Sequence, residues 1–278
     1  MVLIMELRVI LHGPMDPRFN MAIDEAILIA VKETRRPTLR LYMWKPTGVS
    51  LGRRQRVEEA VNINRLMEKG YILVRRPTGG AALIHGEEKE ITYSLVVPRD
   101  STLYRLSIDE SASLISSGIA LALKKLGLNA RIGGFSGFSE ERNLCYLRVG
   151  ASDITVDGRK ISGSAQVRNS HGLLQHGTLL IGIDYNDWIE VIKTAFGKEE
   201  LKSSITSLRR LGINADLEKI INAMINGFTE ALNLKPFLSS ISPRELEIAY
   251  KLYKFKYSSP KWNLEGRIEY KQMDFNNN

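Results

Sequence analysis

The spacing of apolar positions changes early in the chain, and this change predicts where helix gives way to strand. Residues 20–33 place apolar side chains at the three- and four-residue spacing of an amphipathic helix, which ends before Pro37. The chain then becomes rich in β-branched and aromatic residues, in short runs typical of strands. We expect strands over Leu39–Trp44, Gly48–Leu51, Tyr71–Arg75, Ala81–Ile84 and Ile91–Val97, with a helix over Val57–Glu68.

The rest of the chain has further strands in its middle and helices toward its end. Ser107 and Glu110 form a capping box that predicts a helix through Leu126, closed by Gly127. We expect strands over Ile154–Val156, Lys160–Val167 and Leu173–Ile183, and helices over Trp188–Phe196, Leu217–Leu232 and Pro243–Lys254. The first eleven residues are predicted to form an edge strand, because Glu6 and Arg8 interrupt their apolar run.

The order of these elements indicates an α+β fold with a mixed, largely antiparallel sheet flanked by helices. The alternating strand–helix units of a doubly wound fold are absent from the pattern, and no dinucleotide or Walker motif occurs. At 278 residues the length suits one large domain, or one domain with an appendage. We expect a catalytic domain over residues 1–235 and a short helical C-terminal segment, 236–278, packed on it.

Composition narrows the partners and the compartment. The formal charge of +8 would suit nucleic acid, an anionic surface or an acidic protein. The basic residues are scattered rather than clustered in an arm, so we favour an acidic protein partner over nucleic acid. One cysteine excludes an intramolecular disulfide and favours a reducing, cytoplasmic location. No run approaches the roughly 18 apolar residues of a spanning helix, so we expect no membrane insertion.

A glycine turn flanked by arginines is the first candidate site. In the segment Arg75–His85, two arginines precede Gly79 and Gly80 within a run that otherwise indicates strand. Paired glycines let backbone N–H groups approach a ligand closely, and arginine forks can bind anions or carbonyl oxygens. An ordinary tight turn between strands is the alternative.

A hairpin carrying a lysine is the second candidate site. Asp157-Gly158 lies between two apolar runs, a strong hairpin signal that puts Lys160 near the start of the return strand. The small side chains that follow, at Gly163, Ser164 and Ala165, suggest that a ligand lies against this backbone, since a core-filling strand would carry larger residues. The alternative is a solvated hairpin lysine.

Together with four further segments, these two sites resemble the lipoate–protein ligase, octanoyltransferase and biotin ligase superfamily. The further segments are Arg18–Ala26, Leu39–Gln55, Ser204–Leu208 and Lys256–Asn263. Within the superfamily the chain is most similar to the LipM-type octanoyltransferases and to the small catalytic subunit of archaeal-type lipoate–protein ligases. The wording Glu90-Ile91-Thr92-Tyr93-Ser94 resembles the transferases more than the ligases.

The resemblance implies roles for the residues of both sites. It assigns Arg75, Thr78, Gly79, Gly80 and His85 to the wall around an acyl chain and its head group. It places Lys160 at the reacting carbonyl and His176 in the same pocket, although a histidine satisfied within the core is an equal alternative for His176. No metal site is expected, because the histidines are accompanied by no second cysteine and no H-E-x-x-H motif.

Cys145 distinguishes two mechanisms. It lies fifteen positions before Lys160, a spacing similar to that of the LipM-type transferases. A thiolate there could take an octanoyl group from an acyl carrier protein thioester and hold it for a lysine of a lipoyl domain, and that route needs no cofactor. The acceptor would be the glycine cleavage H protein or the E2 subunit of a 2-oxoacid dehydrogenase.

Two other interpretations remain open at this point. In the first, the chain is the catalytic subunit of a lipoate–protein ligase that uses free lipoate, ATP and Mg²⁺, works with a possible accessory subunit, and has Cys145 as a bystander. In the second, the chain is a noncatalytic protein that uses the same fold for binding.

Overall fold

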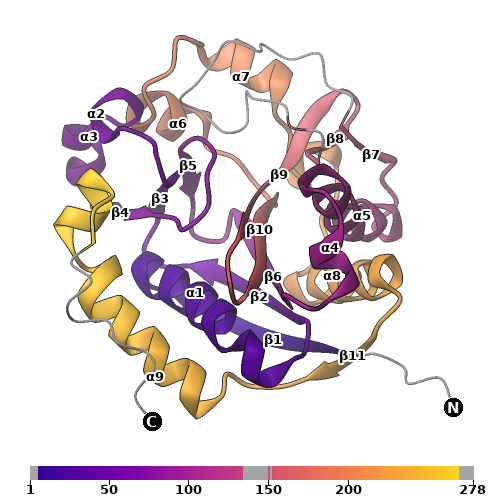
Figure 1. Ribbon diagram of the computed structural model, residues 1–278. Coiled ribbons are helices and arrows are strands. Elements are labelled where there is room, and N and C mark those ends of the chain that lie inside the picture. The colour runs from indigo at the N-terminus through magenta and orange to yellow at the C-terminus, as the bar shows by residue number, and fades with distance from the viewer. Residues whose placement is uncertain (1–5, 134–149, 151, 269–278) are drawn as a thin grey trace, which may run out of the picture.

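The computed structural model describes residues 6–133, 150 and 152–268, and the statements below concern these residues. They form a large eight-stranded sheet in the order β11-β1-β2-β6-β10-β9-β8-β7 and a small three-stranded sheet in the order β4-β3-β5 (Figure 1). The strands are β1 (Glu6–Met15), β2 (Thr38–Trp44), β3 (Gly48–Leu51), β4 (Ile72–Arg75), β5 (Leu83–His85), β6 (Glu90–Pro98), β7 (Ala130–Ile132), β8 (Ile154–Val156), β9 (Arg159–Arg168), β10 (Gly172–Leu180) and β11 (Lys235–Leu238). The α-helices are α1 (Pro17–Thr34), α2 (Val57–Ala60), α3 (Ile63–Glu68), α4 (Thr102–Arg105), α5 (Ile108–Lys125), α6 (Tyr185–Val191), α7 (Lys198–Ser204), α8 (Leu217–Leu232) and α9 (Pro243–Leu252). A 3₁₀ turn, η2 (Arg209–Leu211), and two π-helical segments, η3 (Tyr253–Tyr257) and η4 (Lys261–Glu265), complete the helical elements of the described residues.

The large sheet has the predicted mixed, largely antiparallel character. β1 runs parallel to β2 and β11. The remaining neighbours in the sheet, β2-β6, β6-β10, β10-β9, β9-β8 and β8-β7, pair antiparallel. The predicted edge position of the N-terminal strand is wrong, because β11 pairs along its outer side. β11 has four residues and contains Pro236, so it gives little strand signal in the sequence. The predicted boundary between residues 235 and 236 falls inside this strand.

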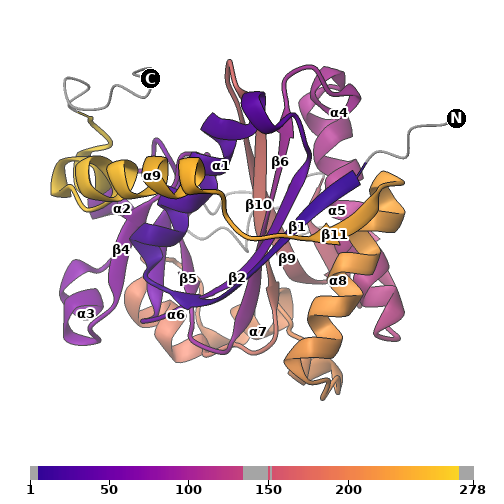
Figure 2. The same cartoon turned by 90° about the horizontal axis from the view of Figure 1, so that it is seen from below.

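Helices cover both faces of the large sheet (Figure 2). α1 lies on one face and packs against β6 and β10, with α9 alongside it, whereas α5 and α8 cover the other. Asp16 caps α1 by accepting hydrogen bonds from the backbone N–H groups of Arg18 and Phe19. The helices α5 and α8 approach closely at Gly118, where an added Cβ would lie 2.6 Å from the ring of Phe228. Two apolar cores therefore sandwich the sheet.

Two local predictions are confirmed, and two predicted helices are wrong for the same reason. The capping box of Ser107 and Glu110 opens α5, and the predicted hairpin joins β8 to β9. The helix predicted over Val57–Glu68 is instead two short helices, and α6 ends at Val191 rather than continuing to residue 196. Both interruptions occur where extended backbone at Val61 forms a β-bridge with Ile192, a tertiary contact invisible to local patterns.

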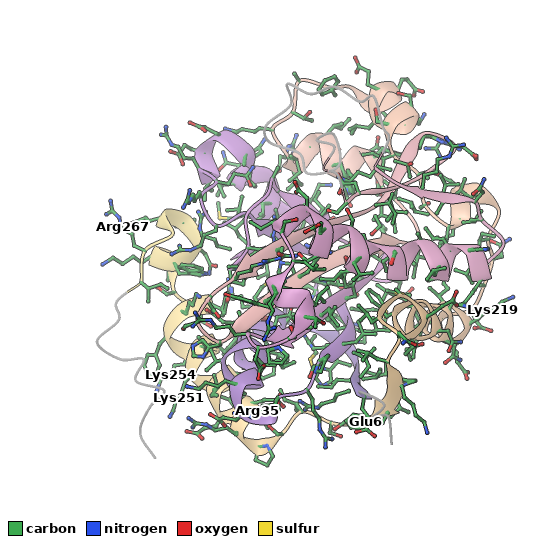
Figure 3. All side chains as sticks on the ribbon, turned by 45° about the vertical axis from the view of Figure 1, so that its right-hand side comes forward. Glu6, Arg35, Lys219, Lys251, Lys254 and Arg267 are labelled. Carbon is green, nitrogen blue, oxygen red and sulfur yellow. The ribbon has the colours of Figure 1, made fainter. Side chains whose placement is uncertain are left out.

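Charged side chains are spread over the surface of the described residues. Labelled charged side chains such as Glu6, Lys219 and Arg267 lie at the periphery, far from one another (Figure 3).

The C-terminal segment packs against α1, where Lys256 donates to both carboxylate oxygens of Glu25 at 2.7 and 2.6 Å. Among the described residues, no helix combines the length and the apolar character needed to cross a membrane.

Candidate active site

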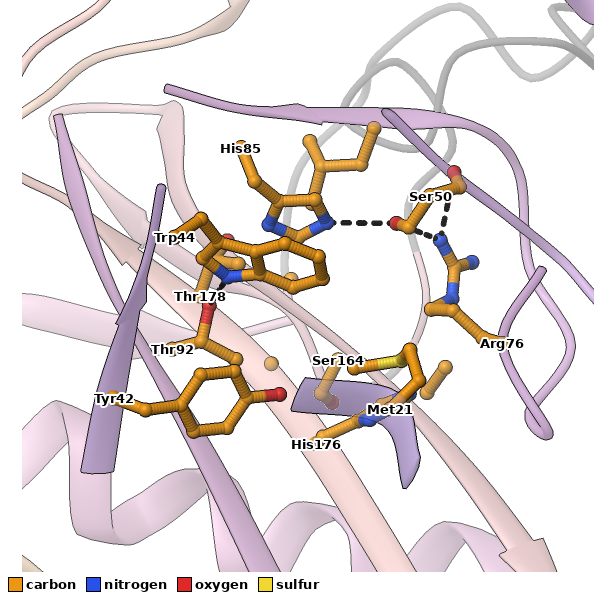
Figure 4. Close-up of a pocket in the computed structure, with 14 residues that line it drawn as sticks. Met21, Tyr42, Trp44, Ser50, Arg76, His85, Thr92, Ser164, His176 and Thr178 are labelled. Atoms are coloured by element: carbon orange, nitrogen blue, oxygen red, sulfur yellow. Dashed lines mark hydrogen bonds between the residues drawn. The ribbon is translucent and has the colours of Figure 1, made fainter. Parts of the chain in front are cut away.

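A cavity lies between the α1 face of the large sheet and the small sheet (Figure 4). About 350 Å³ of space lies between protein atoms there, part of it open to solvent. It is lined by Met21, Tyr42, Trp44, Ser50, Arg76, Leu83, His85, Thr92, Gly163, Ser164, Ala165, His176, Gly177 and Thr178. The two candidate segments of the sequence therefore meet in one place.

Many lining residues are polar, but their polar atoms bond to the protein. The indole N–H of Trp44 donates to the hydroxyl of Thr92 at 2.7 Å, and this hydroxyl donates to Glu90 at 2.8 Å. The Tyr42 hydroxyl donates to Asp24 at 2.8 Å. Once these groups are paired, what remains for the cavity is largely ring and methyl carbon. Such a wall suits an apolar ligand.

Asp24, which is fully buried on α1, organises one side of this wall. Its carboxylate accepts hydrogen bonds from Arg40 and Ser94 at 2.8 Å, besides the bond from Tyr42. His176 lies 3.3 Å away through Nδ1. Burial favours a raised pKa for Asp24, but the hydrogen bond from His176 and the charge of Arg40 outweigh it and lower the pKa. The carboxylate is therefore ionised and paired.

His176 joins this carboxylate to the glycine turn. Its Nε2 lies 2.7 Å from the hydroxyl of Thr78, and Nδ1 faces Asp24. Burial lowers the pKa of His176, so the imidazole is neutral near pH 7. The ring of His176 lines the cavity, while both of its nitrogens bond to groups inside the protein. Thr78 lies behind the ring and outside the lining.

His85 occupies the opposite wall in a similar arrangement. Its Nδ1 lies 2.6 Å from Glu90, and its Nε2 lies 2.7 Å from the hydroxyl of Ser50. The imidazole stacks on the indole of Trp44, with ring centroids 3.8 Å apart and an interplanar angle of 14°. Arg76 also binds this group, donating to the Ser50 hydroxyl at 2.6 Å.

Lys160 lies inside the protein, which argues against the solvated hairpin lysine. Its side chain is 1% exposed and its Nζ donates to Asp153 at 2.7 Å. A Cβ added to Gly163, which lines the cavity, would lie 3.1 Å from Nζ. The glycine therefore leaves the space that the amine occupies beside the wall. The small-residue run accommodates both the lysine and the cavity.

The glycine turn differs from its predicted geometry at Arg75. This guanidinium donates to backbone carbonyls of two segments, including Gly52 at 2.9 Å and Trp262 at 3.0 Å. It does not line the cavity and instead fastens the C-terminal segment to the turn, whereas the next residue, Arg76, is a lining residue. The side-chain bonds of Arg75 to main-chain oxygens could not be inferred from its sequence neighbours.

Gly79 and Gly80 lie on the exposed turn next to the cavity rather than among its lining residues. Gly80 has a φ of +93°, a conformation that favours glycine. Its carbonyl packs closely on Gly52, and a Cβ added to Gly52 would lie 1.8 Å from the carbonyl oxygen of Gly80. Cys145 lies outside the described residues, so its role remains a prediction.

Sequence reasoning missed the partners that hold these residues. Asp24, Ser50, Glu90 and Asp153 each contact a predicted site residue or its network. One signal was present, since Asn20 and Asp24 lie four apart on the face of the predicted amphipathic helix that also carries Ile27 and Val31, and a carboxylate on a buried helix face needs a partner. The others give no local signal.

Comparison with known proteins identifies the family. Residues 16–229 match the model of the lipoyl protein ligase A/B catalytic domain. The chain belongs to this family. It is 32% identical over 276 residues to the octanoyltransferase LipM of Brevibacillus brevis, covering 92% of this chain and 98% of that protein. The predicted superfamily and the expectation of an enzyme are confirmed.

Solved structures support the same fold. A lipoate–protein ligase A bound with ATP superposes with a TM-score of 0.83 at 26% identity, covering 95% of this chain and all of that one. The bipartite lipoate–protein ligase of Thermoplasma acidophilum, studied with its E2 lipoyl domain, gives a TM-score of 0.82 at 25% identity, covering 95% and 98%. The α+β ligase-like fold is therefore confirmed, and the curated relatives of this lipoyl family include the octanoyltransferases.

Proposed function

We propose that the protein transfers an octanoyl group to a specific lysine of a lipoyl domain, with lipoyl as a related acyl group. The observation that carries the proposal is the cavity whose polar residues bind one another and leave carbon facing inward. The extended similarity to octanoyltransferases supports the same acyl chain. The reaction would take place in the cytoplasm, the compartment that the single cysteine favours.

The proposed reaction has two steps, and both involve the thiol of Cys145. Its thiolate attacks the carbonyl of the octanoyl acyl carrier protein, the carrier's carbon–sulfur bond breaks, and the released thiol carries the proton lost by Cys145. The acceptor lysine then attacks the new thioester as a neutral amine. A carbon–nitrogen bond forms, the bond to Cys145 breaks, and a proton from the amine passes to the sulfur.

Lys160 would support both steps from its buried position. As an ammonium it favours the Cys145 thiolate, and as a neutral amine it can accept a proton from the thiol or from the incoming lysine. Asp153, 2.7 Å away, holds the amine beside Gly163. This route needs no cofactor.

The partners follow from the reaction. The acceptor would be a lipoyl-domain protein, either the glycine cleavage H protein or the E2 subunit of a 2-oxoacid dehydrogenase. The bipartite ligase studied with its E2 lipoyl domain supports an acceptor of this kind. The basic charge of this chain would favour acidic partners, among them the carrier that delivers the octanoyl group.

The second candidate function is ATP-dependent ligation of free lipoate through a lipoyl adenylate. The structural similarity to a ligase that binds ATP favours it. In this case Mg²⁺ would accompany ATP, Lys160 would bind the acyl adenylate, and an accessory subunit would be required, as the bipartite neighbour suggests.

Intact-mass measurement of a lipoyl domain separates the two functions. The domain is incubated with the protein and either octanoyl acyl carrier protein or lipoate with ATP and Mg²⁺. We expect an octanoyl adduct with the carrier, together with a thioester on Cys145, and loss of both in Cys145→Ala. Undiminished transfer by Cys145→Ala would contradict the covalent route. A lipoyl adduct obtained only with ATP would establish ligation instead.

A further inference from the structure

A chain of hydrogen bonds runs along the His85 wall between two groups that can only donate. At one end is the indole N–H of Trp44, and at the other is the guanidinium of Arg76. Between them lie Thr92, Glu90, His85 and Ser50, all of them buried. Because both ends are donors, the directions of the bonds between them follow once every buried hydroxyl hydrogen is required to have an acceptor.

The direction from the Trp44 end is fixed by the hydroxyl of Thr92. This oxygen accepts the indole hydrogen at 2.7 Å, so its own single hydrogen is free for Glu90, whose Oε1 lies 2.8 Å away. Glu90 Oε1 therefore accepts. The other oxygen, Oε2, is buried and lacks a hydrogen-bond partner among the described residues.

The direction from the Arg76 end is fixed by the hydroxyl of Ser50. This oxygen accepts a guanidinium hydrogen at 2.6 Å, and its only other partner among the described residues is His85 Nε2 at 2.7 Å. No other acceptor for the hydroxyl hydrogen lies among the described residues, so this buried hydrogen is paired only when Nε2 accepts it. An imidazolium, which has hydrogens on both nitrogens, would leave the buried hydroxyl hydrogen of Ser50 without an acceptor among the described residues.

His85 is therefore a neutral imidazole with its hydrogen on Nδ1, donated to Glu90 at 2.6 Å. We infer that Glu90 is a positioning residue for acyl binding. It fixes the tautomer and the plane of His85, so that the ring lies stacked on Trp44 and keeps its N–H away from the acyl chain. The inference rests on the proposed function for the identity of that chain.

The same connectivity of carboxylate, histidine and serine occurs in serine hydrolases, but Arg76 favours positioning over nucleophilic attack. Its Nη1 binds the Ser50 hydroxyl and the Ser50 carbonyl, and its Nη2 binds the carbonyls of Gly79 and Ala81. The Ser50 oxygen thus accepts a charged donor in a fully buried position. The arrangement ties His85 to the glycine turn.

The first test measures the tautomer of His85 in the wild-type protein. Long-range ¹H–¹⁵N correlation spectra of ¹⁵N-histidine-labelled protein at pH 7 report which ring nitrogen carries hydrogen, and a His85→Gln sample assigns the signal. We expect hydrogen on Nδ1 alone. Hydrogen on Nε2, or on both nitrogens, would overturn the inference even if every variant below were inactive.

The second test compares two variants of Glu90 that differ in the acceptor. Glu90→Gln keeps an oxygen for Nδ1, whereas Glu90→Met has similar length and no such acceptor. We expect the methionine variant to move hydrogen to Nε2 and to bind octanoate about tenfold more weakly by calorimetry, the lower end of the loss seen when the partner of a metal-bound histidine is replaced. We expect the glutamine variant to retain the Nδ1 tautomer and to bind octanoate nearly as tightly as the wild type.

The control is Glu88→Gln, which makes the same chemical change at an exposed position two residues away. In octanoyl transfer, Glu90→Met should raise KM more than it lowers kcat, because the wall contacts the chain in the ground state and the transition state alike. Wild-type octanoate affinity and KM in a folded Glu90→Met protein would overturn the inference. Absence of transfer by the wild type would contradict the proposed function, and the tautomer would still decide the role of Glu90.

Discussion

The two carboxylate–histidine pairs of the cavity have similar geometry but different surroundings. Asp24 receives donors on both oxygens, from Arg40, Ser94, Tyr42 and His176. Glu90 receives His85 and Thr92 on one oxygen, and its other oxygen is buried without a described partner. A buried polar atom left unpaired needs a reason other than stability.

The difference indicates separate purposes for the two pairs. Asp24 carries a buried ion pair with Arg40, in which both side chains have no exposed surface, so its loss would affect the whole fold. Among the described residues no lysine or arginine pairs with Glu90, and its main partner is the histidine that lines the cavity. Asp24 therefore anchors the fold as well as one cavity wall, whereas Glu90 serves only the shape of the cavity.

The largest predicted effect is on stability at the anchor. Asp24→Asn removes the charge that compensates Arg40 and should lower the free energy of unfolding by about 3–5 kcal/mol, the range for breaking a buried pair. Glu90→Gln should lower it by only about 1 kcal/mol, because hydrogen bonds but no ion pair are weakened. Urea unfolding at pH 7 measures both. Equal losses would remove the distinction drawn between the two pairs.

A smaller effect comes from removing one hydroxyl donor at each carboxylate. Thr92→Val should lower the free energy of unfolding by about 1–3 kcal/mol, because it also leaves the buried indole N–H of Trp44 without its acceptor. Ser94→Ala should lower it by no more than about 1 kcal/mol, since Asp24 keeps its other donors. Urea unfolding of the two variants, side by side, tests this order. A larger loss for Ser94→Ala would contradict it.

The comparison also explains what could be predicted from sequence. The hairpin at Asp157-Gly158 and the capping box at Ser107 were predictable, because each depends on residues adjacent in the chain. Arg75 was misplaced for the opposite reason. Its role is set by carbonyl oxygens of residues 262–264, nearly two hundred positions away, and arginines next to a glycine turn look alike whether they bind a ligand or the backbone.

The candidate site divides in the same way. His85, Lys160 and the small residues at 163–165 were found from motifs, whereas Glu90 and Asp24 became visible only when strands and helix were assembled. Glu90 and Asp24 stand in segments that carry the resemblance, Glu90–Ser94 and Arg18–Ala26, but neither segment shows which side chain the carboxylate holds. Its role is defined by a distance across the fold, which local sequence does not encode.

The smallest predicted effect is a dependence of stability on pH that belongs to the Asp24 side. Burial, with a contribution from Arg40, lowers the pKa of His12 to about 4, and burial lowers that of His176. The folded protein therefore binds fewer protons than the unfolded chain below the ordinary histidine pKa of about 6.5. The contribution of these two histidines to the free energy of unfolding is therefore fully present above pH 6.5 and declines as the pH falls toward 4.

Substitution of His12 isolates its share of this decline. His12 is the partly exposed member, and its Nδ1 accepts a hydrogen bond from Arg40 at 2.8 Å, which a glutamine oxygen can also do. His12→Gln should therefore keep its stability at pH 7 and lose less than the wild type between pH 6.5 and 4.5, by a fraction of the about 1.4 kcal/mol per pH unit that one full proton would give. Urea midpoints across this range measure the slope. An unchanged slope would place the titration elsewhere, and a steeper one would reverse the sign argued for the Asp24 side.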